Sequence, residues 1–280
     1  MEQRTWFITG INSGFGRHMT EQLLERGDKV AGTVRNMNSV EDLKEKYGAL
    51  LRVFHLDVTD TNTIYEVVDQ AFNELGKIHV IVSNAGYGLI GAAEELTIEQ
   101  ITHQINTNLL GSIHLIRASL PHLRAQGEGH IIQLSSSAGQ TAFSGGSLYH
   151  ATKWGIEGFC EAVRQEIAPF NISLTIVEPS GARTNFTHHS VVLGQKLEAY
   201  SISQAHNARR GFEDTSIVPI GDPARMVKIM IDSADQKPAP IRIALGSGAY
   251  NTIHQSLSNR LEELEAQKEL AFSTDFPANK

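Results

Sequence analysis

Short apolar runs alternate with longer amphipathic segments along this 280-residue chain. The apolar runs predict seven strands, at Trp6–Thr9, Lys29–Val34, Leu51–Leu56, Val80–Ser83, His130–Leu134, Leu174–Glu178 and Ile241–Ala244. The amphipathic segments predict helices at Gly14–Glu25, Val40–Tyr47, Thr61–Leu75, Thr97–Ala118, Ser147–Ala168 and Asp222–Ser233. Since strands and helices of these lengths alternate, we predict one α/β domain over residues 1–280. It is a doubly wound parallel sheet of about seven strands with helices on both faces.

Two segments lie outside the alternation. Residues 184–221 form a long polar connection, which we expect to act as a lid or substrate-binding region. Residues 250–271 predict a C-terminal helix with leucines at positions 257, 261 and 264. Leu23, Val67 and Ile156 are expected in the core.

Composition narrows the class of protein. An apolar content of 41% and a charged content of 20% are typical of a globular protein, and the net charge of −7 argues against nucleic-acid binding. No run of about 18 apolar residues predicts a transmembrane helix, and the N-terminus does not resemble a signal peptide. The single cysteine, Cys160, excludes an internal disulfide. We therefore expect a cytoplasmic protein without a membrane partner.

A glycine-rich turn joins the first predicted strand to the first predicted helix, with the sequence Thr9-Gly10-Ile11-Asn12-Ser13-Gly14-Phe15-Gly16. Glycines permit a tight turn and let the backbone approach a pyrophosphate at a helix N-terminus. The spacing departs from Gly-x-Gly-x-x-Gly, and a plain strand-to-helix turn is the alternative. Its position after the first strand favours a dinucleotide site in a Rossmann-type domain.

The end of the second strand bears on cofactor preference. Domains that prefer NAD usually place an acid there for the ribose 2′-hydroxyl, whereas an arginine accommodates the 2′-phosphate of NADP. Val34 occupies the place of that acid and Arg35 follows it. NADP(H) is therefore favoured and NAD(H) stays possible; the alternative for Arg35 is a solvated loop cation.

Tyr149 and Lys153 lie four residues apart in a predicted helix, thirteen or more residues after Ser136. Positions i and i+4 share a helix face, so the phenol and the ammonium are expected side by side. A nearby cation favours the phenolate and would lower the tyrosine pKa from about 10 towards that of a general acid/base. A chance surface pair is the alternative.

Together these residues resemble the classical short-chain dehydrogenase/reductase family over about the first 185 residues. Further motifs carry the resemblance: Asp57-Val58, Asn84-Ala85-Gly86, Asn108-Leu-Leu-Gly111 and the serine before Tyr149-x-x-x-Lys153. Two positions depart from the family pattern, Ser83 where asparagine is frequent and Pro179-Ser180 in place of Pro-Gly. The turn and the end of the second strand are similar to the 17β-hydroxysteroid and retinol dehydrogenase branch.

The resemblance implies roles for these residues. Tyr149 would be the general acid/base, Lys153 would hold the nicotinamide ribose, Ser136 would donate to the substrate oxygen, and Asn108 would position a helix and a water. Ser135 or Ser137 could replace Ser136 as the donor, and Asn108 could simply bond across a helix. The implied cofactor-binding set is Gly10, Asn12, Ser13, Gly14, Phe15, Gly16, Arg35, Asp57, Val58, Asn84, Ala85, Gly86, Tyr149, Lys153, Pro179 and Thr184.

These expectations point to an NADP-dependent carbonyl reductase, reversibly an alcohol dehydrogenase, acting on a hydrophobic ketone, aldehyde or secondary alcohol. Candidate pocket residues are Phe143, Phe186, Val191, Val192, Leu193, Tyr200 and Phe212, with Leu89–Ala93 and Gln140–Ser144. The alternatives are a non-catalytic NADP-binding sensor or scaffold, and an epimerase or dehydratase. The His188-His189 pair has no third ligand with zinc-like spacing, so no metal is expected. The resemblance also implies a homodimer or homotetramer, formed through the helices at Thr97–Ala118 and Ser147–Ala168.

Overall fold

The computed structural model describes residues 2–184, 186, 190–214 and 216–276. Its main sheet has seven strands in the order β3-β2-β1-β4-β6-β7-β9, and all neighbouring strands are parallel. Their bounds are β1 (Thr5–Thr9), β2 (Lys29–Val34), β3 (Leu51–His55), β4 (Val80–Ser83), β6 (Gly129–Leu134), β7 (Ile172–Pro179) and β9 (Arg242–Leu245). All seven predicted strands are present, and the predicted α/β doubly wound fold is confirmed. The strand order reverses between β1 and β4, where ligands bind in such sheets.

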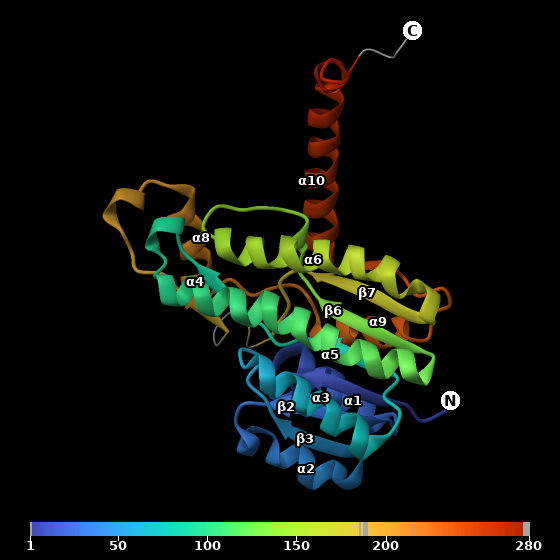
Figure 1. Ribbon diagram of the computed structural model, residues 1–280. Helices are drawn as coiled ribbons and strands as arrows, with labels where there is room; N and C mark the ends of the chain where they lie inside the picture. The colour runs from blue at the N-terminus through green and yellow to red at the C-terminus, as the bar shows by residue number, and fades with distance from the viewer. Residues whose placement is uncertain (1, 185, 187–189, 215, 277–280) are drawn as a thin grey trace.

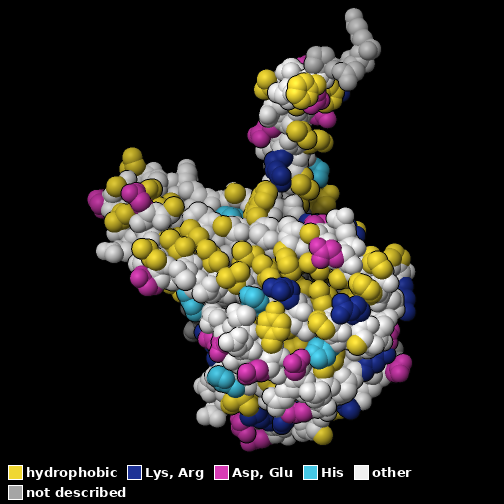
Figure 2. All heavy atoms as spheres, in the orientation of Figure 1, with side chains coloured by type: hydrophobic (Ala, Val, Ile, Leu, Met, Phe, Trp, Pro, Cys, Tyr) yellow, Lys and Arg dark blue, Asp and Glu magenta, His cyan; other side chains and the backbone are white. Residues whose placement is uncertain are grey.

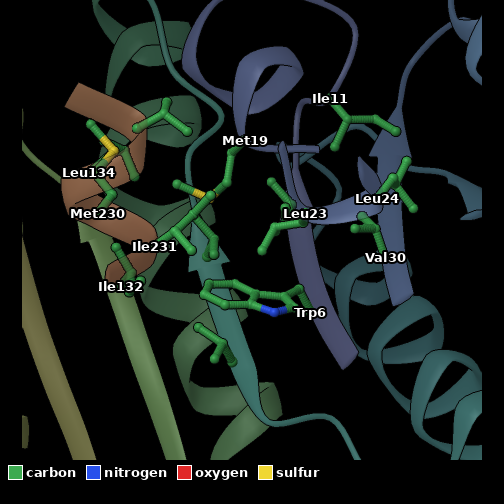
Figure 3. Close-up of a cluster of buried hydrophobic side chains, with 14 of the residues drawn as sticks. Trp6, Ile11, Met19, Leu23, Leu24, Val30, Ile132, Leu134, Met230 and Ile231 are labelled. Atoms are coloured by element: carbon green, nitrogen blue, oxygen red, sulfur yellow. The ribbon is translucent and has the colours of Figure 1, made fainter. Parts of the chain in front are cut away.

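Helices cover both faces of this sheet (Figure 1). One layer contains α1 (Gly14–Glu25), α2 (Glu41–Tyr47) and α9 (Pro223–Ser233), and the other contains α3 (Thr61–Leu75), α5 (Gly111–Gln126) and α6 (Ser147–Ile167). Figure 3 shows the core between the sheet and the layer of α1, α2 and α9, where Met19 and Leu23 of α1 meet Met230 and Ile231 of α9 around Trp6. Leu23, Val67 and Ile156 are buried as predicted. Because helices cover both faces of the sheet, side chains on both faces of a strand are buried, and the strand sequences are therefore continuous apolar runs.

The segment predicted as one helix, Thr97–Ala118, has a different course. Helix α4 (Ile98–Ile105) begins at a capping box formed by Thr97 and Gln100 and passes into a π-helical turn, Asn106–Leu110. Helix α5 then continues past Pro121 to Gln126 and ends at Gly127, whose φ is +78°. The predicted end at Ala118 is therefore wrong, because the left-handed glycine and not the proline terminates the helix.

The 184–221 region contains regular structure that the polar sequence did not predict. Strand β8 (Val191–Leu193) pairs in parallel with β5 (Gly88–Ile90), and helix α8 (Gln204–Glu213) follows. The Arg183 amide donates to the Gly221 carbonyl at 2.9 Å, so the two ends of the region lie together. This lid region, defined here as residues 184–221, is therefore anchored to the body. The His188-His189 pair lies outside the described residues.

The predicted C-terminal helix divides into α10 (Ser247–Ala266) and α11 (Lys268–Phe272). Within α10 only Ala249 and Ile253 are buried. Figure 1 shows α10 standing away from the rest of the molecule. Among the described residues, no helix has both the length and the apolar content needed to cross a bilayer.

Candidate active site

The glycine turn is sterically confined at the carboxyl end of β1. Gly10 and Gly14 have φ values of +73° and +55°. A Cβ on Gly16 would lie 2.2 Å from the Gly10 carbonyl oxygen and 2.6 Å from Asn84 Nδ2. Ser13 is the N-cap of α1 but its side chain makes no capping bond. The first turn of α1 therefore keeps its amides available, and this cradle fits a pyrophosphate group.

Asn84 holds this turn against the end of β4. Its Nδ2 donates to the carbonyl oxygens of Thr9 at 2.7 Å and Gly10 at 3.1 Å. Thr9 Oγ1 accepts from the amides of Asn84 at 2.9 Å and Ala85 at 3.0 Å. The Asn84 side chain, expected from the resemblance to bind the cofactor, is thus a structural brace between the two strands at the switch point.

Arg35 and Asp57 lie at the neighbouring strand ends. Arg35 is exposed. Burial acts to raise the pKa of Asp57, but hydrogen bonds from Thr59 and the charge of Arg35 outweigh it and lower that pKa. Asp57 Oδ1 accepts from the Thr59 amide at 2.9 Å and from its hydroxyl at 2.7 Å. An exposed cation therefore follows β2, where a 2′-phosphate would lie in a Rossmann-type domain.

The remaining residues of the expected cofactor set surround the turn. Thr184 packs across from Gly14, since a Cβ on Gly14 would lie 3.9 Å from Thr184 Cβ. A Cβ on Gly86 would lie 3.2 Å from Asn108 Oδ1, so the segment after β4 lies directly against Asn108. Pro179 is buried at the end of β7, Asn12 is exposed, and Ser13, Phe15 and Val58 are partly buried.

Tyr149 and Lys153 lie on one face of α6, as predicted. The Lys153 ammonium is 5.7 Å from the centre of the Tyr149 ring and donates to the Leu134 carbonyl at 2.9 Å. Burial lowers the pKa of Lys153 to about 8, with the charge of Glu157 acting in the opposite direction.

The prediction that Lys153 lowers the pKa of Tyr149 is wrong for this structure. Burial is the largest influence and raises the Tyr149 pKa, because it removes water from the phenolate; a hydrogen bond with Ser136 acts in the opposite direction. The phenol is therefore held in its protonated form at neutral pH, which suits a proton donor.

Hydrogen-bond partners distinguish Ser135 from Ser136. Ser135 is buried, and its hydroxyl donates to Glu157 Oε1 at 2.5 Å. Ser136 caps the short helical turn Ser137–Gly139, its Oγ accepting from the Ala138 amide at 3.2 Å, and it lies against Tyr149. The geometry therefore favours Ser136 as the hydroxyl that faces the reacting group.

Asn108 is buried within the π-helical turn and braces it. Its Oδ1 accepts from the Tyr87 amide at 3.0 Å, and its Nδ2 donates to the Tyr87 carbonyl at 2.8 Å and to Thr152 Oγ1 at 3.5 Å. The bond across to another helix, weighed as an alternative, is present in the contact with Thr152 of α6. Single π-helical turns inside helices are frequent at functional sites.

Sequence reasoning missed two residues of α6 that hold the loop carrying Ser136. His150 Nε2 accepts from the Phe143 amide at 2.9 Å, so its hydrogen lies on Nδ1, which donates to the Ala138 carbonyl at 2.9 Å. Glu157 accepts from Ser135 and from Gln140 Nε2. Both share the helix face of Lys153, at i−3 and i+4, and that spacing was the signal available in the sequence.

Glu157 also belongs to an acid cluster around Arg242 of β9, in which Glu157 and Glu178 are buried and Glu161 is partly exposed. Arg242 Nη1 donates to Glu157 and, at 2.6 Å, to Glu178, while Nη2 donates to Glu161 at 2.9 Å. Burial and the charge of Glu157 raise the pKa of Glu178 to about 7. The loop before α6 is thus fixed to an edge strand of the sheet.

The lid region lies beside Tyr149. The Phe186 ring is centred 6.4 Å from the Tyr149 ring, and it contacts Gly88 of β5. Phe143 and Val192 are exposed, and Val191, Leu193 and Phe212 are partly buried. One of the candidate pocket residues, Phe186, therefore lies beside the phenol.

Polar contacts attach this lid to the body. Glu95 accepts from the Ala92 amide at 2.8 Å, from the Leu197 amide at 2.9 Å and from His206 Nε2 at 2.6 Å. The expected pocket residue Tyr200 instead donates its hydroxyl to Glu94 at 2.7 Å. Tyr200 therefore anchors the lid and does not point into an apolar pocket.

A doubly wound parallel sheet, a glycine turn at its switch point and a Tyr–Lys pair beside that turn define a dinucleotide-binding oxidoreductase. The family model described as short chain dehydrogenase matches residues 4–191. The chain belongs to this family and is a short-chain NAD(P)-dependent oxidoreductase.

Known proteins of similar sequence are themselves oxidoreductases. The chain is 33% identical to Oxidoreductase BOA17 of Botryotinia fuckeliana, over 88% of this chain and 90% of that protein. It is 35% identical to a 3-ketodihydrosphingosine reductase of Bacteroides thetaiotaomicron over 67% of each chain. Retinol dehydrogenase 7 of Mus musculus is 32% identical over 68% of this chain and 60% of its own length.

Solved structures share the fold over most of the chain. A short-chain dehydrogenase from Streptomyces avermitilis has a TM-score of 0.92 and 33% identity, covering 98% of this chain and 100% of its own. A serine dehydrogenase complexed with NADP+ has a TM-score of 0.71 and 26% identity, covering 86% and 93%.

Proposed function

We propose that this protein is an NADP-preferring carbonyl reductase, reversibly an alcohol dehydrogenase, for hydrophobic ketones, aldehydes or secondary alcohols. The observation that carries the proposal is the convergence of Ser136, Tyr149 and Lys153 at the edge of the sheet that also holds the glycine turn. When bound, the nicotinamide supplies or accepts the hydride at the substrate carbon. The residues around it orient the substrate and move the proton.

Tyr149 donates its phenolic proton to the carbonyl oxygen of the substrate during reduction. Ser136 donates a second hydrogen bond to that oxygen and stabilises the charge that develops there. Lys153, which carries a positive charge below pH 8 and lies beside the Tyr149 ring, would hold the nicotinamide ribose. Asn108 fixes the junction of α4 and α5 against α6, which sets the position of this group.

The apolar surroundings of Tyr149 support a hydrophobic substrate. Phe186 approaches the phenol from the lid, and its ring is centred 6.4 Å from the Tyr149 ring. The names of two relatives, a retinol dehydrogenase and a 3-ketodihydrosphingosine reductase, support a lipophilic alcohol or ketone. The similarity to a retinol dehydrogenase also supports the proposal that the chain is related to the retinol and 17β-hydroxysteroid dehydrogenase branch.

Arg35 supports the preference for NADP, since it is an exposed cation after β2 without an acid in the preceding position. A charge-assisted bond to a 2′-phosphate contributes about 1.5–3 kcal/mol. Arg35→Ala is thus expected to weaken NADPH binding roughly 10- to 100-fold and to leave NADH binding almost unchanged. Equal losses for both cofactors would contradict this role.

The test of the function follows loss of NADPH absorbance with a panel of aliphatic, aryl and steroidal ketones and retinal. Tyr149→Phe is expected to lower kcat by roughly 10²- to 10⁴-fold with NADPH affinity retained. Tyr47→Phe makes the same chemical change at a remote tyrosine that bonds Glu25, and it should leave kcat unchanged. Near-normal turnover by Tyr149→Phe would overturn the assignment of the proton donor.

A further inference from the structure

Among the described residues, helix α10 contacts the body from its start as far as Arg260. Ala249 and Ile253 are buried, Ser256 Oγ donates to the Gln140 carbonyl at 2.8 Å, and the Arg260 guanidinium lies 4.8 Å from the centre of the Trp154 ring. Beyond Arg260 every described residue of the helix is exposed. The end of α10, residues 261–266, therefore projects into solvent in the single chain (Figure 1).

Helix α10 carries an apolar stripe along its length, defined here as Tyr250, Leu257, Leu261 and Leu264. These side chains are 64%, 47%, 58% and 65% exposed. Their spacings of seven, four and three residues place them on one face of the helix. Figure 2 shows apolar side chains along this helix. Most of the stability of a protein helix comes from packing of its apolar face, and this stripe is unpacked in the single chain, so the stripe needs a partner.

The charges around the stripe distinguish between possible partners. The outer part of α10 carries three acids, Glu262, Glu263 and Glu265, against one cation, Arg260. Helices that bind anionic membrane surfaces are instead rich in lysine and arginine on their polar face. The acidic flank therefore disfavours a lipid surface as the partner.

The same charges favour a second copy of the helix. Arg260 lies on one side of the stripe and Glu265 on the other, five residues further along. In a parallel pair of helices packed through such a stripe, flanking residues at this spacing face each other across the interface. Each copy would therefore contribute one Arg260–Glu265 contact, and two-fold symmetry would produce the contact twice.

We propose that α10 pairs in parallel with α10 of a second copy of this chain through Tyr250, Leu257, Leu261 and Leu264. This interface is separate from the α4–α5 and α6 helices through which family resemblance implies association. It also reaches the active site, because Ser256 holds the Gln140 carbonyl and the Trp154 indole donates to the Thr141 carbonyl at 3.0 Å. Pairing of α10 therefore steadies the loop that follows Ser136.

A charge placed in the stripe tests the interface. Leu261→Glu combined with Leu264→Glu is expected to halve the mass of the assembly in size-exclusion chromatography with light scattering. Asn259→Glu combined with Ala266→Glu adds the same charge on the opposite side of the helix and should leave the mass unchanged. NADPH binding by both variants shows that the body is folded, independently of any carbonyl substrate.

A cross-link tests the parallel arrangement directly. Cys160, the chain's one cysteine, is buried, so an introduced surface thiol has little background. Leu264→Cys is expected to give a disulfide-linked dimer under mild oxidation, and Asn259→Cys is not. Failure of Leu264→Cys to link, or an unchanged mass for the double glutamate variant, would overturn the proposal. So would a monomer that sediments with phosphatidylcholine vesicles through the stripe, since lipid would then be the partner.

Discussion

Replacement of Glu157 by glutamine tests the acid cluster, because it removes one of two buried carboxylates that share Arg242. The side chains of Glu157 and Glu178 are each 3% exposed, and both accept from Arg242 Nη1. Glutamine keeps the shape of the side chain but presents an amide to donors that now bind a carboxylate. The expected loss of stability depends on which carboxyls are ionised.

At pH 5 the loss of folding free energy caused by Glu157→Gln is expected to be large. The pKa of Glu178 is raised to about 7 by burial and by Glu157, so Glu178 is protonated and Arg242 relies on Glu157 for its buried counter-charge. Removal of a charge-assisted bond of this kind costs about 2–3 kcal/mol.

At pH 8 the loss of folding free energy caused by Glu157→Gln is expected to be smaller. A folded-state pKa above the unfolded value of 4.5 means that the folded chain binds the proton more tightly, so stability falls as pH rises from about 4.5 to 7. A pKa rise from 4.5 to about 7 corresponds to roughly 3 kcal/mol. Glu157→Gln removes the repulsion that causes part of this loss. The substitution is thus expected to destabilise the protein by about 1–2 kcal/mol less at pH 8 than at pH 5.

Urea unfolding of both proteins at pH 5 and pH 8 measures this difference. Glu161→Gln is the matched control, since Glu161 also binds Arg242 but is 36% exposed; its cost should stay below about 1 kcal/mol at both pH values. A Glu157→Gln cost that is equal at the two pH values, or larger at pH 8, would refute the description of the cluster.

Three further substitutions or conditions give separate tests. Gly16→Ala should abolish NADPH binding measured by fluorescence, because its Cβ would meet the Gly10 carbonyl at 2.2 Å; Gly158→Ala, with open space around it, should bind normally. His150→Gln should lower kcat roughly 10- to 100-fold with little change in KM for NADPH, because it keeps one of two bonds to the loop of Ser136. The kcat/KM for reduction should fall as pH rises through about 8, where Lys153 loses its charge. Glu157→Gln should shift this fall in kcat/KM to lower pH, because the charge of Glu157 raises the Lys153 pKa. A fall at the same pH in both proteins would contradict that coupling.

Local sequence was enough to predict the elements of the fold and several positions of the site. The seven strands follow from apolar runs, and the turn at Gly10–Gly16 follows from glycines whose conformation the structure requires. The i, i+4 spacing placed Lys153 beside Tyr149 because a helix brings those positions to one face. Parallel order then brings the ends of β1, β4 and β6 together.

Contacts between distant segments were not predictable in this way. The lid reads as a polar loop, yet β8 pairs with β5 and Glu95 binds His206, which is 111 residues away in the chain. The course of α4 and α5 depends on the bonds of Asn108 to Tyr87 and Thr152, which exist only after the helices have packed. A polar sequence pattern indicates only that most side chains of a segment are exposed to water. It does not indicate which of its residues bind a buried partner in a distant segment.

The sequence by itself therefore determined the order of strands and helices, the glycine turn and the Tyr149–Lys153 pair, because each depends on residues within a few positions. Only the tertiary structure decided the protonation of the site. Burial raises the Tyr149 pKa and lowers that of Lys153 to about 8, while Arg242, 85 residues from Glu157, binds the acid cluster behind them. Hydration and charge at a buried atom depend on all the segments that surround it, and those segments meet only when the chain has folded.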